Sequence, residues 1–173
     1  ALLTTQVLAL SGAQINSLGA TKLGALTSTQ VAAMSIKQLG ALTSTSLQAL
    51  SSDAVKALNV NQLLSLSTSA SAGFTTDQIN ALGSTQVSSF KIEQLNALSS
   101  NNLQKISTSG IKGLSAVQVS GLSSTQLNNL LTTQLQALDT ADLVTLNESQ
   151  VSNLSTTQLS NFTSTQLQAL TPL

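Results

Sequence analysis

The sequence contains no cysteine, histidine, tryptophan, tyrosine or arginine, and these absences exclude much of the chemistry that enzymes use. Without cysteine there is no disulfide and no thiolate nucleophile, and without cysteine and histidine the usual zinc ligands are missing. A serine nucleophile needs a base within hydrogen-bond reach, and histidine, the commonest base, is absent. We therefore expect no enzyme, and no catalytic, cofactor-binding or metal-ligating residues.

Charged residues are scarce as well: they make up 7% of the 173 residues, and six lysines balance six acidic residues. Binding to nucleic acid requires a basic face that displaces counterions from phosphates, and a polybasic membrane patch requires clustered cations. Six scattered lysines in a chain of zero net charge supply neither. No apolar run approaches the ~18 residues of a membrane span. The sequence thus predicts no nucleic-acid partner and no membrane span.

What the sequence does contain is an eight-residue repeat. Every eighth residue from Leu2 to Leu170 is large and apolar, at all 22 positions. A second apolar column lies three residues before the first, from Val7 to Leu167, and only Ser71 interrupts its 21 positions. No insertion or deletion breaks the period. Residues 1–173 therefore form one uninterrupted array and a single domain.

Each octad begins with the signature of a helix start. Its consensus is Ser/Thr-Ser/Thr-Thr-Gln-Leu/Val-x-Ala-Leu, and position one holds a favoured N-cap residue in 18 of the 20 octads from Ser11 to Leu170. Gln at position four completes a capping box, in which the cap side chain and the Gln side chain each satisfy a backbone amide. The pairs that fit fully are Ser11/Gln14, Thr27/Gln30, Ser35/Gln38, Thr75/Gln78, Ser115/Gln118, Ser123/Gln126, Ser155/Gln158 and Thr163/Gln166.

The spacing predicts an all-α solenoid of very short helices, one per octad. In a single continuous helix the apolar stripe would advance 80° every eight residues and would spiral around the axis. Helices of about one and a half turns are unstable alone, so neighbouring octads must stack their apolar columns. A β-solenoid is the alternative, because Thr, Val and Ile suit strands. Columns three residues apart would then need a corner to point inward together.

Variation among the octads refines this prediction. Position seven is usually small, which suggests that a neighbouring backbone passes close to it. Odd and even octads do not differ, so the structural unit is one octad. If two octads form each coil, about eleven coils at helix-packing distance span about 100 Å.

Two octads, 67–74 and 107–114, are irregular. Each is either a hinge or contact site or a tolerated weak repeat. In a third octad, Leu131 replaces the cap residue.

The few polar groups with chemical potential have simple structural interpretations. Asp139 and Asp142 occupy a cap and a first turn, Glu148 follows in the next octad, and acids at helix starts complement the helix dipole. The other acids, Asp53, Asp77 and Glu93, lie at position three of their octads, and the lysines are scattered at positions 22, 37, 56, 91, 105 and 112. Asn147, Asn153 and Asn161 begin glycosylation triplets, which matter only in a eukaryotic secretory pathway.

The phrases LTSTQ, LSTTQL and LTTQLQAL begin at Leu26, Leu154 and Leu131. They resemble the LTTxQ-type octapeptide arrays of large bacterial secreted or surface proteins, many of them adhesin-like. The resemblance covers the whole chain and implies an extracellular or cell-surface location with a stalk or adhesive role.

These observations predict a non-enzymatic structural rod or spacer that forms filaments. The alternative function is a binding module whose regular Ser/Thr/Asn/Gln face contacts a glycan, a surface or ice. Neither residues 1–3 nor residues 163–173 contain a charged cap, although terminal repeats of solenoids usually have a polar outer face. We therefore expect the array to continue or to associate head to tail.

Overall fold

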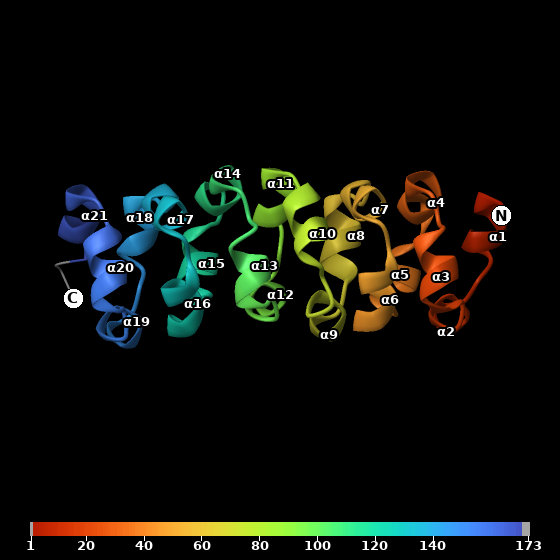
Figure 1. Ribbon diagram of the computed structural model, residues 1–173, viewed down its shortest axis with the longest axis horizontal. Coiled ribbons are helices and arrows are strands. Elements are labelled where there is room, and N and C mark those ends of the chain that lie inside the picture. Colours follow the sequence, from red (N-terminus) through yellow and green to blue (C-terminus); the bar gives the residue numbers. More distant parts are fainter. Residues whose placement is uncertain (1, 171–173) are drawn as a thin grey trace.

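The computed structural model describes residues 2–170, in which each octad from residue 3 onward contains one short helix (Figure 1). Residue 1 and residues 171–173, part of the proposed uncapped ends, lie outside the described residues. The helices are α1 (Thr4–Leu8), α2 (Gly12–Asn16), α3 (Gly19–Gly24), α4 (Ser28–Ala33), α5 (Ile36–Gly40), α6 (Ser44–Ala49), α7 (Ser52–Lys56), α8 (Val60–Ser65), α9 (Thr68–Ser71), α10 (Thr76–Ala81), α11 (Ser84–Ser88), α12 (Ile92–Asn96), α13 (Ser100–Leu103), α14 (Thr108–Lys112), α15 (Ala116–Gly121), α16 (Ser124–Asn129), α17 (Thr132–Ala137), α18 (Thr140–Leu143), α19 (Glu148–Ser152), α20 (Thr156–Asn161) and α21 (Ser164–Ala169). Residues 2–170 include no strand, so the all-α prediction is confirmed and the β-solenoid alternative is wrong.

The caps explain where the helices begin and why they are short. At Ser35, for example, the backbone is extended (φ −69°, ψ 156°), and the hydroxyl accepts from the amide of Gln38 at 3.2 Å. Before every helix except α3, an extended cap residue redirects the chain, and each helix is limited to between four and six residues. Seven of the eight predicted capping boxes form completely; at Ser155 only the hydroxyl half forms.

Stacking occurs between every third helix, so a coil contains about three octads and the two-octad coil considered above is wrong. Helix α4 packs on α1 and α7, α7 packs on α10, and the same interval continues to α18 and α21. Three helices can surround a common interior, whereas two facing helices would leave it open at both sides. Twenty-one helices taken three at a time give about seven coils, so the rod spans about 60 Å instead of about 100 Å.

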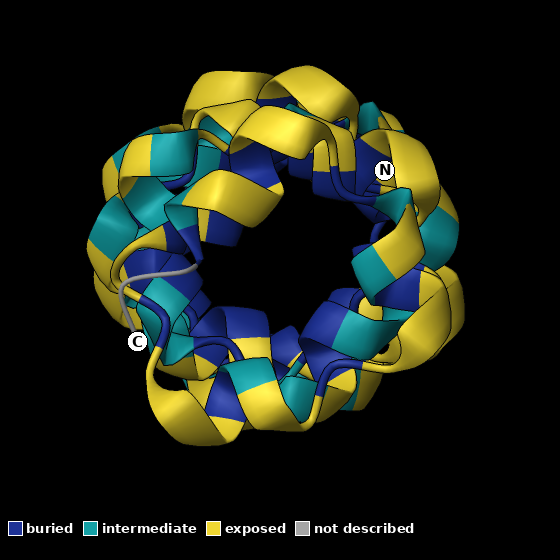
Figure 2. Cartoon of the chain, turned by 90° about the vertical axis from the view of Figure 1, so that its left-hand side faces the viewer, coloured by how far each residue is buried: buried dark blue, intermediate teal, exposed yellow. Residues whose placement is uncertain are grey.

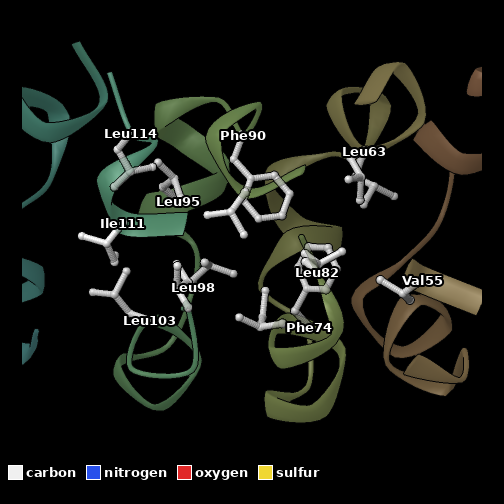
Figure 3. Close-up of a cluster of buried hydrophobic side chains, with 14 of the residues drawn as sticks. Val55, Leu63, Phe74, Leu82, Phe90, Leu95, Leu98, Leu103, Ile111 and Leu114 are labelled. Carbon is white, nitrogen blue, oxygen red and sulfur yellow. The ribbon is translucent and has the colours of Figure 1, made fainter. Parts of the chain in front are cut away.

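The two apolar columns fill the interior of the coil. Seen along the rod, buried residues face inward all the way round and exposed residues face outward (Figure 2). Leu47, Leu63 and Leu95 of the position-five column are fully buried, and the position-eight residues Leu98 and Leu114 are 5% and 4% exposed. Side chains from successive coils meet in one continuous cluster (Figure 3). Burial in this shared core is what stabilises helices too short to form alone.

The irregular octad 67–74 keeps its place in this core. Ser71, which interrupts the apolar column, is fully buried, and its hydroxyl donates to the carbonyl of Ser67 at 3.0 Å. Phe74 and Phe90 pack together nearby with ring centroids 5.7 Å apart (Figure 3).

Position seven is small because neighbouring coils meet there, as the sequence indicated. A Cβ atom added to Gly73, at position seven, would lie 2.2 Å from the carbonyl oxygen of Ser44, and one added to Gly12, at position two, would lie 2.3 Å from the Cβ of Ala41 at position seven. At Gly121 the neighbour is the side chain of Ile92, three octads earlier, at 2.7 Å. Position seven of one octad thus faces position two of the octad below it.

Candidate functional site

The most regular feature of the chain is a ladder of glutamine side chains that joins successive coils. Gln78 is 1% exposed; its Oε1 accepts from the backbone amide of its own cap, Thr75, at 2.9 Å. Its Nε2 donates to the carbonyls of Leu47 and Leu50 in the preceding coil, at 2.9 and 2.7 Å. One side chain therefore starts a helix and fastens it to the coil below.

The same arrangement recurs along the chain. The amide nitrogen at position four reaches a carbonyl 28 residues earlier in every ladder octad except that of Gln126, and in most octads it also reaches one 30 or 31 residues earlier. The ladder residues that donate to a carbonyl of the preceding coil are Gln30, Gln38, Gln62, Gln78, Gln86, Gln94, Gln118, Gln126, Gln134, Gln150, Gln158 and Gln166, and Asn102 has the same role.

Sequence reasoning found the capping half of this ladder and missed the half that joins the coils. A signal for it was present. A capping box accepts Glu as well as Gln at its fourth position, yet Glu occurs at position four of no octad. A carboxylate can accept from the cap amide but has no N–H to donate to a carbonyl. The use of glutamine, and never glutamate, to complete the capping boxes therefore indicated a donor function.

A second, more exposed set of bonds runs in the opposite direction. Asn or Gln at position six donates to a position-seven carbonyl 25 residues later, as from Asn16 to Ala41 at 2.8 Å. Asn128 does the same to Asn153 at 2.8 Å, and its Oδ1 also accepts from the amide of Ser155 at 2.9 Å. Asn128 thereby satisfies the cap amide that Gln158 was expected to bind, which explains the incomplete capping box.

The ladder is interrupted where position four lacks an amide side chain, at Lys22, Ser46, Ala54, Ala70, Gly110 and Asp142. At Asp142 a carboxylate stands where the neighbouring octads place a donor. Burial raises the pKa of the Asp142 carboxyl above its ordinary value, and the nearby charge of Asp139 raises it further. The predicted pair Asp139/Asp142 is thus brought together, at the N-cap and in the first turn of α18, although Asp139 forms no side-chain cap bond.

The outer surface is as regular as the core. Position three is exposed in all 21 octads from Thr5 to Thr165, and nine of these residues are threonine. Asp53, Asp77 and Glu93 lie in this outer column, as their octad position indicated, and all six lysines are exposed. No group of three or more potential metal-ligating side chains occurs among residues 2–170. None of the helices in this range is long and apolar enough to cross a membrane.

Other positions singled out from the sequence are scattered over this surface. Leu131, at a cap, is 45% exposed, and Gln134 still accepts from its backbone amide at 2.9 Å. Of the glycosylation triplets, Asn147 uses its side-chain oxygen as a helix cap, and Asn153 donates to the carbonyl of Ser149 at 2.7 Å. Asn161 is half-buried. Glu148 lies at the exposed start of α19.

Cavities open at the two ends of the described rod. The cavity at the first coil has a volume of about 700 Å³ and the cavity near the last coil about 300 Å³. The first is lined by Leu2, Gln6, Leu18, Lys22, Ala25, Leu26, Thr27 and Gln30, and the second by Glu148, Val151, Ser152 and Leu170. Residues of the apolar columns line both cavities in part, Leu18 and Leu26 in the first and Val151 and Leu170 in the second.

The model of the ALTTAQ repeat family matches residues 135–172, less than a quarter of the chain. A comparison with curated proteins finds no significant match. The matched segment covers the last octads, which follow the same period as the rest of the sequence. The comparison supports a repeat protein, in agreement with the helical solenoid.

Proposed function

We propose that this chain is a non-enzymatic structural rod that sets a fixed distance between parts of a larger protein or assembly. The observation that carries the proposal is the glutamine ladder, whose bonds join each coil to the next along the length of the rod. Such bonds resist bending and stretching at every coil. The cross-section is repeated from coil to coil, so length is the property that the sequence controls.

We further propose a location at the cell surface or outside the cell, and head-to-tail association of rods. The resemblance of the octads to secreted repeat arrays supports the location, as does a surface in which Ser, Thr, Asn and Gln supply most of the polarity. The open cavities at both ends support the association. Apolar residues line both cavities, and exposed apolar surface commonly marks interfaces.

The rod is tested by changing its length in whole coils. Because the chain has no cysteine, Thr29→Cys and Thr165→Cys at exposed positions place two unique labels near opposite ends. Duplicating residues 115–138 in tandem adds three octads, and thus one coil. We expect the distance between the labels, measured by pulsed spin-label spectroscopy, to rise by about 8–10 Å with a narrow distribution. An unchanged distance or a broad distribution would contradict the rod.

The outer threonine column favours a second candidate function, a binding module for a glycan or a surface. Its nine threonines are exposed at the same octad position, which holds charged residues only at Lys37, Asp53, Asp77 and Glu93. Glutamate substitutions at Thr29, Thr125 and Thr133 would disturb this face without touching the core. A spacer should tolerate them with its stability unchanged, whereas a binding module should lose retention on a panel of immobilised glycans.

A further inference from the structure

The hydrogen bonds that join coils are not spread evenly along the rod. A ladder residue donates to carbonyls 28–31 residues earlier, so each run of four octads is joined to the run before it. Residues 43–74 form such a run, which contains α6 to α9 and follows residues 11–42. We call the boundary between these two runs the sparse interface. Three of the four ladder positions above it lack an amide side chain and hold Ser46, Ala54 and Ala70.

Three hydrogen bonds cross the sparse interface among the described residues. Gln62, its single ladder amide, donates to the carbonyls of Ala32 and Met34, both at 2.8 Å. The backbone amide of Thr43 donates to the side-chain oxygen of Asn16 at 3.3 Å. The exposed set of bonds that starts at position six does not cross it, because the residues that would donate are Gly24, Ala32 and Gly40.

The next two interfaces toward the C-terminus carry more than twice as many of these bonds. Seven join residues 75–106 to residues 43–74, and their donors are Gln78, Gln86, Gln94 and Asn102. Seven also join residues 107–138 to residues 75–106, and their donors are Asn96, Gln104, Gln118, Gln126 and Gln134. Both interfaces have the same period and core columns as the sparse interface, so they are internal references for it.

The sparse interface also leaves acceptors without donors. The ladder register assigns the carbonyls of Leu26 and Leu42 to positions that hold alanine. Both leucines are buried, and within the described residues no hydrogen bond reaches either carbonyl. A buried carbonyl without a donor raises the free energy of the closed interface, and opening lets water bind it. The closed state is therefore less favoured here than at the two reference interfaces.

We propose that the sparse interface is the yield point of the rod, the place where it opens first when it is pulled, bent or partly unfolded. Each repeat of a solenoid contacts only its neighbours, so interfaces open separately and the least stable one opens first. Opening here separates residues 43–74 from the coil before them and leaves the later coils stacked. This device rests on the proposed rod function, because a defined place of opening matters in a protein that bears load.

Thiol labelling measures how often each interface opens. The chain has no cysteine, and Val55 and Val119 both occupy position five of their octads and are 0% exposed. Val55 lies above the sparse interface, and Val119 lies above an interface with seven bonds. Valine and cysteine are similar in size, so Val55→Cys and Val119→Cys each add one buried thiol with little change in packing. We expect the Val55→Cys thiol to react with an aqueous disulfide reagent at least about tenfold faster.

A pair of ladder variants tests whether the opening is local. Gln62→Glu keeps the acceptor for its cap amide and removes both donors across the sparse interface. Gln134→Glu makes the same change at the interface below residues 107–138. We expect Gln62→Glu to speed labelling at Val55 by at least about tenfold and to leave labelling at Val119 unchanged. Gln134→Glu should have the reverse effect. Circular dichroism verifies that both variants remain folded.

Equal labelling rates at Val55 and Val119 in the otherwise wild-type chain would overturn the yield point. This comparison needs no ladder variant, so it decides the question even where Gln62→Glu does not fold. Labelling that rises at both sites in either folded variant would also overturn it, because the rod would then open as a whole.

Failure of the yield point is distinguishable from failure of the rod. Small-angle scattering reports the shape of the chain. An elongated chain with equal labelling rates refutes the yield point and leaves the rod intact. A compact chain with a radius of gyration near the ~16 Å of a globular chain of this length would refute both.

Discussion

At the scale of single residues, the amide group of glutamine is what the repeat depends on. Its oxygen serves the local helix and its nitrogen serves a carbonyl 28–31 residues away. The local half was predictable because Ser/Thr-x-x-Gln is a contiguous motif. The distant half was not, because its partner depends on how many octads complete a coil, and no single octad contains that information.

The contribution of the hydrogen bonds between coils can be measured separately with Gln78→Glu. The substitution keeps the acceptor for the Thr75 amide and removes both donors to Leu47 and Leu50. Because the side chain is 1% exposed, it also buries a carboxylate beside two carbonyl oxygens. We expect a loss of about 3 kcal/mol in the free energy of unfolding by urea. Gln14→Glu, the same change without a coil below, should cost less than about 0.5 kcal/mol. Equal losses in both variants would show that the hydrogen bonds between coils do not contribute to the free energy of unfolding.

A substitution at Asp142 can make the opposite change and place a hydrogen-bond donor at a ladder position that lacks one. Asn102 shows that the shorter amide reaches the ladder, since it donates to Phe74 at 2.6 Å. Asp142→Asn should therefore stabilise the chain at pH 7 by up to about 1 kcal/mol, the value of one hydrogen bond. A Leu114 carbonyl, 28 residues earlier, is the expected acceptor.

The pH dependence of that variant follows from the raised pKa of Asp142. The folded state binds the proton more tightly than the unfolded state, so the contribution of this group is fully present below its ordinary pKa of about 3.9. It is lost as the pH rises through the higher folded-state value. The stability advantage of Asp142→Asn should thus shrink on acidification across this window. Urea titrations at successive pH values measure it, and a pH-independent advantage would contradict the assignment.

At the scale of the element, the octad is defined by its cap, its two core positions and the small residue at position seven. All four were recognisable from the sequence, because each recurs at a fixed place in the period. The identity of the facing position was not recognisable. Gly121 against Ile92, and Gly73 against Ser44, show that position seven meets position two of the octad three earlier. That pairing again follows from the number of octads per coil.

The distance between position seven and its neighbour differs between octads. Alanine substitutions at two glycines of position seven test how much this distance matters. In Gly73→Ala the new Cβ would lie 2.2 Å from the carbonyl oxygen and 2.6 Å from the Cα of Ser44, so backbone must move. We expect a loss of about 1–3 kcal/mol in the free energy of unfolding. In Gly113→Ala the nearest atom is at 3.4 Å, an ordinary contact. That variant should be neutral or slightly more stable, because alanine restricts the unfolded chain. Equal destabilisation of both variants would show that the close approach at Gly73 is unimportant.

At the scale of the whole molecule, the periodicity predicted a solenoid but left the size of the coil open. Two apolar columns can be buried with two, three or more octads per coil, so core burial alone does not select a number. We infer that polar groups select the number of octads per coil. With about three octads per coil, the end of the octad four places earlier lies beside each ladder residue, as Leu47 and Leu50 at the end of α6 lie beside Gln78 of α10. Buried amides without partners would be costly, which favours this coil over the alternatives.

If the ladder sets the coil, the chain should accept the removal of one whole octad and reject the removal of half of one. Deleting residues 139–146 removes an octad without a ladder amide. It leaves Gln150, Gln158 and Gln166 again 28 residues after position-eight leucines, now Leu114, Leu122 and Leu130. The position-seven residues that move, Asn153, Asn161 and Ala169, would face Ala116, Ser124 and Thr132, which are small or modest in size.

We therefore expect this octad deletion to retain the helical circular dichroism signal per residue and to change the free energy of unfolding by no more than about 2 kcal/mol. Deleting residues 139–142 instead shifts every later residue by half a period. The core positions of α19, α20 and α21 would then meet caps and exposed threonines of the coil below, and the ladder amides would meet no carbonyl in register. That variant should lose the helical signal of the last three octads. Similar spectra and similar stabilities for the two deletions would show that the eight-residue register, and with it the ladder, does not determine how the coils stack.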